Sequence, residues 1–376
     1  MEDFEDVIVL GEERPTTLAT PSPTLPETDL AATPDRSDLS AADTPDPVTT
    51  IGVFVPDDLP TDPTPEAREL FADAVLAYSA GDFTEAFAQA RRASEGGSTR
   101  AQVLAGNMLF KGEAPIRDDS LAVKLLTPAA DVGDIDALRL LAQLALEGRG
   151  GLRDTDAAPY LKRAADLGDA ESMRALSTVA ARGLGVQPSS EAARAWEDTA
   201  AASGDAESLF RRGARLRESD PISAFDAFSD AAEAGHAEAA YEAAILLSTT
   251  PAIPPDEARV ARLMRQAATN GHPPGMADYG MLVYQGAGVP RDIDAAATWF
   301  RQSAEAGDAE GMFLWAFTLA KGEGVAQDFE ESYYWLLRSG ESGVADYDAA
   351  RSQLRERLEA NVDSAVLERA RARLAQ

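Results

Sequence analysis

The sequence contains no cysteine, and aromatic residues make up only 7% of its 376 positions. Without cysteine the chain can form neither disulfides nor thiolate metal sites. Basic residues are also scarce, because 34 lysines and arginines stand against 64 acidic residues and leave a formal net charge of −30. Since nucleic-acid phosphates and anionic membrane surfaces repel a chain this acidic, we expect neither to be a partner.

Long apolar runs are missing as well. The longest one near the N-terminus, Val7–Leu10, is far too short to cross a bilayer, so we expect no direct membrane insertion. The N-terminus also lacks the basic stretch and the long apolar run of a signal peptide. The sequence therefore predicts a cytoplasmic protein. If a signal upstream of this sequence is missing, we expect a periplasmic or secreted protein instead.

Residues 1–64 differ in composition from everything that follows. Half of the chain's 22 prolines lie at or before Pro65, and residues 1–64 contain 15 acids and only two bases. Such a segment cannot bury enough apolar surface to offset its chain entropy, so we predict a disordered acidic tail. Its two apolar stretches, Val7–Leu10 and Ile51–Val55, are either incidental or short motifs that dock on another surface.

Helical periodicity begins at Glu66, and a unit of about 36 residues then recurs along the chain. Each unit opens on a glycine, and these glycines are Gly97, Gly133, Gly168, Gly204, Gly235, Gly271, Gly307 and Gly343. In the first helix of most units, a very small residue such as Gly106 or Gly280 follows an alanine or a large apolar residue. A small residue at a fixed register predicts that the backbone of a neighbouring helix comes close.

The turn between the two helices repeats the pattern Gly-x-Gly-Val-x-x-Asp, as in GAGVPRD from Gly286. A phosphate-binding loop can also begin with Gly-x-Gly, but it is needed once and it follows a strand. Copies in separate units instead indicate a structural turn. In this turn the glycines adopt positive φ, and Asp292 or Asp328 caps the second helix.

These residues resemble the Sel1-like repeats, which are relatives of the tetratricopeptide repeats. The best unit, Gly271–Glu305, matches the sequence pattern of that family. The matching residues are Gly280, Gly286, Gly288, Val289, Asp292, Ala296, Trp299, Phe300 and Ala304. The resemblance covers about 97–342 and implies an all-α, right-handed α-solenoid of stacked antiparallel helix pairs, with about seven repeats. We expect a tail at 1–64, a capping helical hairpin at 65–96, the repeats at 97–342 and capping helices at 343–376. The units that open at Gly204 and Gly235 lack the glycine turn.

No arrangement of residues predicts chemistry. The only two histidines, His236 and His272, each follow a repeat-opening glycine. Stacked repeats would hold their rings too far apart to share a zinc ion, so we interpret both as loop residues. No Gly-x-Ser-x-Gly motif occurs, and no nucleophile can be paired with a base. We therefore predict a protein that is not an enzyme and has no metal site and no cofactor.

A concave groove along the first helices is the expected binding surface, by analogy with tetratricopeptide arrays. In the N-terminal half its predicted residues are Arg100, Asn107, Asp136, Arg139, Gln143, Glu171 and Arg174. In the C-terminal half they form an apolar row of Phe210, Tyr241, Ile245, Met281, Tyr284, Phe313 and Phe317. An exposed row of this kind anchors a peptide or helix. The alternative is that the row packs between neighbouring first helices.

The predicted function is a non-enzymatic protein–protein interaction module. As an adaptor, scaffold or regulator, it would bind a peptide or helix of one or more protein partners in the groove. One alternative is an envelope-associated repeat protein that binds or processes cell-wall fragments. Another is a purely structural spacer, whose groove would be uniformly polar.

Overall fold

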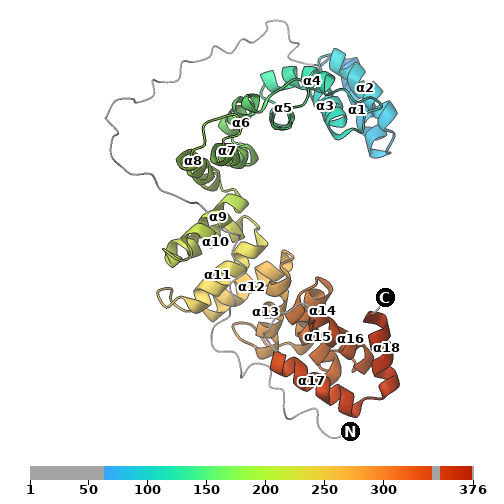
Figure 1. The fold of residues 1–376 in the computed structure, drawn as a ribbon, viewed down its shortest axis with the longest axis vertical. Helices are drawn as coiled ribbons and strands as arrows, with labels where there is room; N and C mark the ends of the chain where they lie inside the picture. Colours follow the sequence, from blue (N-terminus) through green and yellow to red (C-terminus); the bar gives the residue numbers. More distant parts are fainter. Residues whose placement is uncertain (1–62, 341–347, 375–376) are drawn as a thin grey trace. The chain divides into compact units, whose positions relative to one another are not determined.

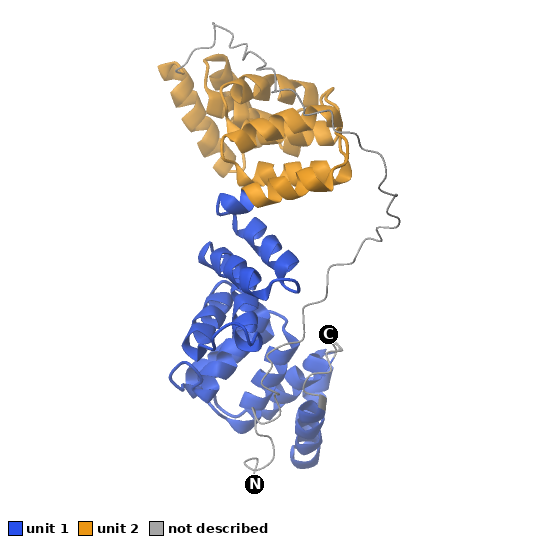
Figure 2. Ribbon diagram, turned by 90° about the vertical axis from the view of Figure 1, so that its left-hand side faces the viewer, with its two compact units in different colours: residues 1–20, 200–376 blue, residues 21–199 orange. Residues whose placement is uncertain are grey.

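The computed structural model describes residues 63–340 and 348–374. Within these residues the regular secondary structure consists of eighteen α-helices and one 3-10 turn, which confirms the predicted all-α class (Figure 1). Residues 1–62, which are nearly all of the predicted disordered tail, lie outside the described residues, and so does the repeat-opening Gly343. The chain divides into two compact units at residue 200 (Figure 2). In chain order, the part before residue 200, orange and labelled unit 2 in Figure 2, is called the first unit here, and the part from residue 200 on, blue and labelled unit 1, is called the second unit.

The first unit, described from residue 63 to 199, is a series of helical hairpins. Its first helices are α1 (Pro65–Ser79), α3 (Thr99–Lys111), α5 (Ile135–Leu146) and α7 (Ala170–Arg182). Its second helices are α2 (Phe83–Glu95), α4 (Asp119–Asp131), α6 (Ala157–Asp166, after the 3-10 turn Asp154–Asp156) and α8 (Ser190–Ala202), which continues into the second unit. From α1 to α7 each helix packs on the next, and α3 also contacts α1 and α5. This is the stacking predicted for a solenoid.

The second unit, described at 200–340 and 348–374, repeats the arrangement. Its first helices are α9 (Ala206–Leu216), α11 (Ala237–Thr249), α13 (Pro273–Gln285), α15 (Ala309–Lys321) and α17 (Asp348–Asn361). Its second helices are α10 (Pro221–Glu233), α12 (Glu257–Thr269), α14 (Ile293–Glu305), α16 (Phe329–Gly340) and α18 (Ser364–Leu374). From α9 to α16 each helix packs on the next. The last helix, α18, packs on α16.

Small residues on the first helices set the distance to the second helices. A Cβ added to Gly106 would lie 2.6 Å from the side chain of Leu126, and one added to Gly280 would lie 2.7 Å from the ring of Phe300. Both distances are shorter than van der Waals contact, so no larger residue fits without a shift of the neighbour. The structure thus confirms the predicted close approach of a neighbouring helix and shows that this helix is the second helix of the same repeat.

The glycine turn has the predicted structural role. Gly286 and Gly288 have φ values of 78° and 66°, and the side chain of Asp292 accepts a 3.0 Å hydrogen bond from the backbone N–H of Ala295 at the start of α14. A Cβ on Gly288 would lie 2.2 Å from the backbone oxygen of Glu257, at the start of the preceding second helix. The second glycine therefore allows adjacent repeats to pack closely, as well as allowing the turn.

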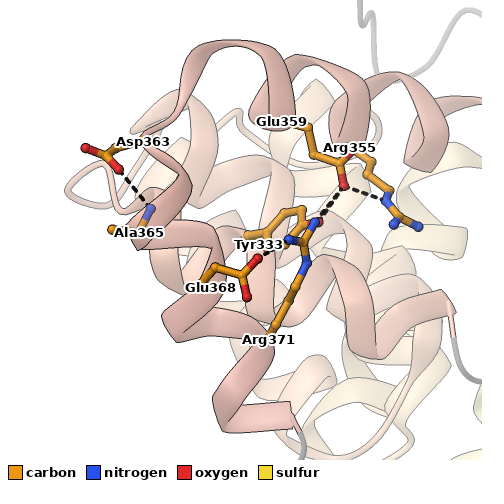
Figure 3. Close-up of polar contacts among 7 residues, drawn as sticks. All are labelled: Tyr333, Arg355, Glu359, Asp363, Ala365, Glu368 and Arg371. Atoms are coloured by element: carbon orange, nitrogen blue, oxygen red, sulfur yellow. Dashed lines mark hydrogen bonds and ion pairs between the residues drawn. The ribbon is translucent and has the colours of Figure 1, made fainter.

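Three side chains fasten the C-terminal helices to the last repeat (Figure 3). Tyr333 on α16 is fully buried, and its hydroxyl donates a 2.6 Å hydrogen bond to Glu359 on α17. Arg371 on α18 donates to the Tyr333 hydroxyl at 2.8 Å and to Glu359 at 3.2 Å. Because the three groups come from three helices, their contacts hold α17 and α18 in one arrangement with α16.

Candidate functional site

The first unit contains a groove of about 590 Å³ on its first helices. Five of the seven predicted polar groove residues line it, namely Asn107, Asp136, Arg139, Gln143 and Glu171. They come from α3, α5 and α7, so one groove spans three successive repeats. Arg100 and Arg174 do not line it.

Arg139 is engaged by carboxylates of its own unit. Its guanidinium lies 3.5 Å from Asp136 and 3.6 Å from Asp169, and it also donates a hydrogen bond to Glu171. Asp169 is the N-cap of α7, where it accepts a hydrogen bond from the Ser172 N–H. Arg139 therefore ties one repeat to the next, and its charge is neutralised before any ligand arrives.

Other donors in the groove have no such partner. Asn107 and Lys111 lie four residues apart on α3, and neither side chain forms a hydrogen bond or ion pair with any described residue. Beside them the groove has apolar surface from Val103, Leu140 and Leu146, and Leu146 is 37% exposed. The groove thus combines free amide and ammonium donors with apolar contact area, which is the composition of a peptide-binding surface.

The apolar row in the second unit is largely part of the core. Ile245, Met281, Phe313 and Phe317 are at most 4% exposed, and all four belong to the main apolar cluster of that unit. These four residues fit the alternative interpretation, which is packing between helices, because a buried side chain cannot contact a partner in this conformation. Phe210, Tyr241 and Tyr284 are only partly buried against the same cluster.

Two of these partly buried residues stack on the histidines. Phe210 lies on the ring of His236 with centroids 4.4 Å apart, and Tyr241 lies on His272 at 4.6 Å. Each histidine is the N-cap of the next first helix, and its Nδ1 accepts a backbone hydrogen bond, at 3.1 Å for His236 and 3.0 Å for His272. Both rings are therefore structural, and this role was not predicted from the sequence.

The same two positions carry an Arg–Asp pair in the first unit. Arg139 stands at the register of Phe210 and Tyr241, and Asp169 stands at the register of the two histidines. The contact between a first helix and the next N-cap is therefore ionic in one place and aromatic in two others. The sequence signal for this difference was the residue directly after the repeat-opening glycine, which is Asp in some repeats and His in two others.

Burial changes the ionisation of these groups. It lowers the pKa of His272 to about 4, with a smaller contribution from the nearby His236. Burial also raises the pKa of Tyr241, and the carboxylate of Asp278 adds to this effect. His272 is therefore neutral at pH 7, as its Nδ1 acceptor role requires.

Tyr284 ties two repeats together. Its hydroxyl donates a 2.8 Å hydrogen bond to Glu323 in the turn of the next repeat. Burial and this hydrogen bond raise the pKa of Tyr284 to about 12. Tyr78 and Glu113 form the same contact at 2.9 Å in the first unit.

Within the described ranges, no group of three or more His, Asp or Glu side chains is placed to hold a metal ion. The two histidines make the contacts described above. Over the same residues, no helix combines the length and the apolar character that a membrane span requires.

The Sel1 repeat pattern matches six segments of the chain, 99–134, 135–169, 170–205, 237–272, 273–308 and 309–344, which together exceed half of its length. The chain belongs to the Sel1 repeat family. The unmatched segment between 205 and 237 contains α9 and α10, a helix pair that packs like the others. Its sequence lacks the glycine turn, and its opening glycine, Gly204, lies only 31 residues before Gly235.

The chain is also similar to several solved structures. A Sel1 repeat protein from Oxalobacter formigenes is 24% identical, with a TM-score of 0.56, and the likeness covers 78% of this chain and 88% of that one. A protective antigen of uropathogenic Escherichia coli with an SLR fold is 21% identical, with a TM-score of 0.43 and coverage of 81% and 75%. An immunity protein of Pseudomonas aeruginosa is 17% identical, with a TM-score of 0.34 and coverage of 57% and 84%. No curated protein matches the chain.

Membership in the family has a general functional meaning. The Sel1 repeat is a fold of protein–protein interaction scaffolds, and it is typically non-catalytic. Family membership does not identify the partner of this chain, which has to be inferred from its own surface.

Proposed function

We propose that this protein is a non-enzymatic scaffold that binds a peptide segment of a protein partner in the groove of its first unit. The observation that supports the proposal is the pair Asn107 and Lys111, two donors without partners that line a groove with apolar surface beside them. Asn107 can hold a backbone carbonyl, and Lys111 can bind an acidic side chain or a terminal carboxylate of the peptide.

The engaged residues of the groove have a supporting role. Asp136 and Glu171 each already form an ion pair with Arg139. They keep α5 and α7 in register, so they shape the groove more than they attract a ligand. The expected ligand is therefore an acidic segment with an adjacent apolar side chain that reaches Leu140 and Leu146.

A direct test uses partners captured by the full chain through photo-crosslinking at position 146, which lines the groove and is left unchanged in the variants. The double variant Asn107→Ala/Lys111→Ala should lose the captured partner. As a control, Lys162→Ala changes an exposed residue on α6 that pairs only with Asp166 and does not line the groove. If the double variant and Lys162→Ala retain the same partner equally, the groove of the first unit is not the binding site.

The localisation remains a proposal as well. We propose a cytoplasmic protein, on the basis of the composition of the N-terminal residues alone. Fractionation of cells with an antibody against the chain would test it, and recovery from the periplasm or the medium would contradict it.

A further inference from the structure

A second groove, of about 470 Å³, lies between α10 and α12 in the second unit. It is formed by second helices, so it differs from the first-unit groove in both position and helix type. Three arginines line it at a spacing of three residues along α12, namely Arg259, Arg262 and Arg265. Six residues of helix rise about 9 Å, so the three side chains leave the helix along a short row.

The three arginines have no carboxylate partner among the described residues. The guanidinium of Arg259 lies over the ring of Phe225 at 4.5 Å, which fixes its position, while Arg262 and Arg265 are exposed. Several other arginines in the described part of the chain are neutralised, as Arg149 is by Asp119 at 2.7 Å. The protein has a net charge of −30, so this row of three unpaired guanidiniums is a positively charged patch on a negatively charged protein.

The remaining lining of the groove is polar. Glu233 is its only carboxylate, so the lining has three positive charges against one negative charge. The Oγ of Ser229 is shielded from solvent and has no hydrogen-bond partner. A ligand with several oxyanions would pair with the guanidiniums.

We propose that this row binds an acidic peptide segment of a partner protein. A row about 9 Å long fits carboxylates on successive side chains of a peptide better than it fits one compact phosphate group. Nucleic acid is disfavoured, because the whole chain repels polyphosphate, and the ring of Phe225 beside the row is buried and covered by Arg259, so it cannot stack on a base. This proposal does not depend on the groove in the first unit.

The test measures binding of fluorescein-labelled hexaglutamate to the full chain by anisotropy, at about 20 mM salt where screening is weak. The double variant Arg262→Ala/Arg265→Ala should weaken binding about tenfold or more, because charge-assisted contacts are lost. The matched control is Arg212→Ala/Arg301→Ala, which removes two exposed arginines that lie in the same unit but outside the groove and have no carboxylate partner among the described residues. The control should change the affinity for hexaglutamate less than about twofold. Both double variants remove two positive charges, so the long-range electrostatic effect is the same in both and only the contacts in the groove differ.

Three outcomes would overturn the proposal. Equal weakening in both double variants would mean that only bulk charge attracts the peptide. Absence of hexaglutamate binding to the wild-type chain would exclude an acidic-peptide site. Displacement of hexaglutamate by an equimolar amount of inorganic phosphate would mean a site for a small anion instead of a peptide. The variant Asn107→Ala/Lys111→Ala should bind hexaglutamate like wild type at this site, so failure here can be told apart from failure of the first-unit groove.

Discussion

The ring of Phe210 lies flat on the imidazole of His236, with the two planes only 14° apart. The imidazole at the same time caps α11 through Nδ1, and its Nε2 lies 3.4 Å from a carboxylate oxygen of Glu207. Both nitrogens are thus used, which fixes the proton on Nε2. One side chain joins two repeats by stacking and starts a helix by hydrogen bonding, so the stack and the cap depend on each other.

The pH dependence of His272 is the first prediction. Its pKa in the folded protein is about 4, below the ordinary histidine value, so the unfolded chain binds more protons between these two pH values. The stability that depends on neutral His272 is fully present above pH 6.5 and is lost as the pH falls toward 4. We expect a loss of about 2 kcal/mol over this window, less than the full shift because the ring is partly solvated.

The variant His272→Asn isolates this effect, because asparagine also caps a helix but does not titrate. The difference in unfolding free energy between wild type and variant should shrink as the pH falls. Proton NMR of the two histidine rings, assigned with His236→Asn, should show His272 half protonated near pH 4. A midpoint close to the ordinary value, or a stability difference that does not change with pH, would contradict the structure.

A methyl group at Gly280 is expected to destabilise the second unit. The added Cβ would lie 2.7 Å from the ring of Phe300 and 3.1 Å from the Cβ of Trp299, so α13 and α14 must separate. Overpacking of this kind costs about 1–3 kcal/mol. Gly340→Ala is the control, since its Cβ would meet nothing within 4 Å and alanine favours helix. Urea unfolding should show a loss for Gly280→Ala alone; equal midpoints for both variants would contradict close packing at Gly280.

Removal of the Tyr284 hydroxyl tests the tie between two repeats. Tyr284→Phe deletes the 2.8 Å hydrogen bond to Glu323 and should cost about 1–2 kcal/mol, because the acceptor is a carboxylate. Tyr160→Phe is the matched change, since the Tyr160 hydroxyl forms no hydrogen bond among the described residues. Thermal unfolding should separate the two variants. If both unfold like wild type, the contact with Glu323 does not stabilise the stack.

The attachment of α18 should depend on Arg371. Without its contacts to Tyr333 and Glu359, α18 keeps the ion pairs Arg369–Glu330 and Arg373–Glu331 but loses its link to α17 (Figure 3). We expect amide exchange in 364–374 to rise about fivefold in Arg371→Ala, which corresponds to about 1 kcal/mol. Exchange in α13 should not change.

Arg357→Ala on α17 provides the comparison, because its side chain has no partner within the described part of the chain. It should leave exchange in α18 unaltered. An equal rise in both variants would mean that loss of an arginine charge, and not the Tyr333–Glu359 contact, loosens the helix.

The sequence by itself determined the repeat and its local chemistry. Glycines with positive φ, an Asp that caps the next helix and small residues at a fixed register are requirements of a single hairpin. They depend on residues close in the chain, so their spacing predicted them, and Gly280, Gly286 and Asp292 have the roles expected. The tail prediction also rests on composition alone, and it concerns residues outside the described part of the chain.

The tertiary structure decided which of the predicted groove residues stay accessible. Register placed Phe313 and Asn107 on the same kind of surface, yet Phe313 is buried and Asn107 lines an open groove. The difference arises because neighbouring first helices cover one residue and not the other, and this coverage depends on side chains about 36 residues away. The stacking of Phe210 on His236 has the same origin, since neither residue alone indicates that the other repeat supplies its partner.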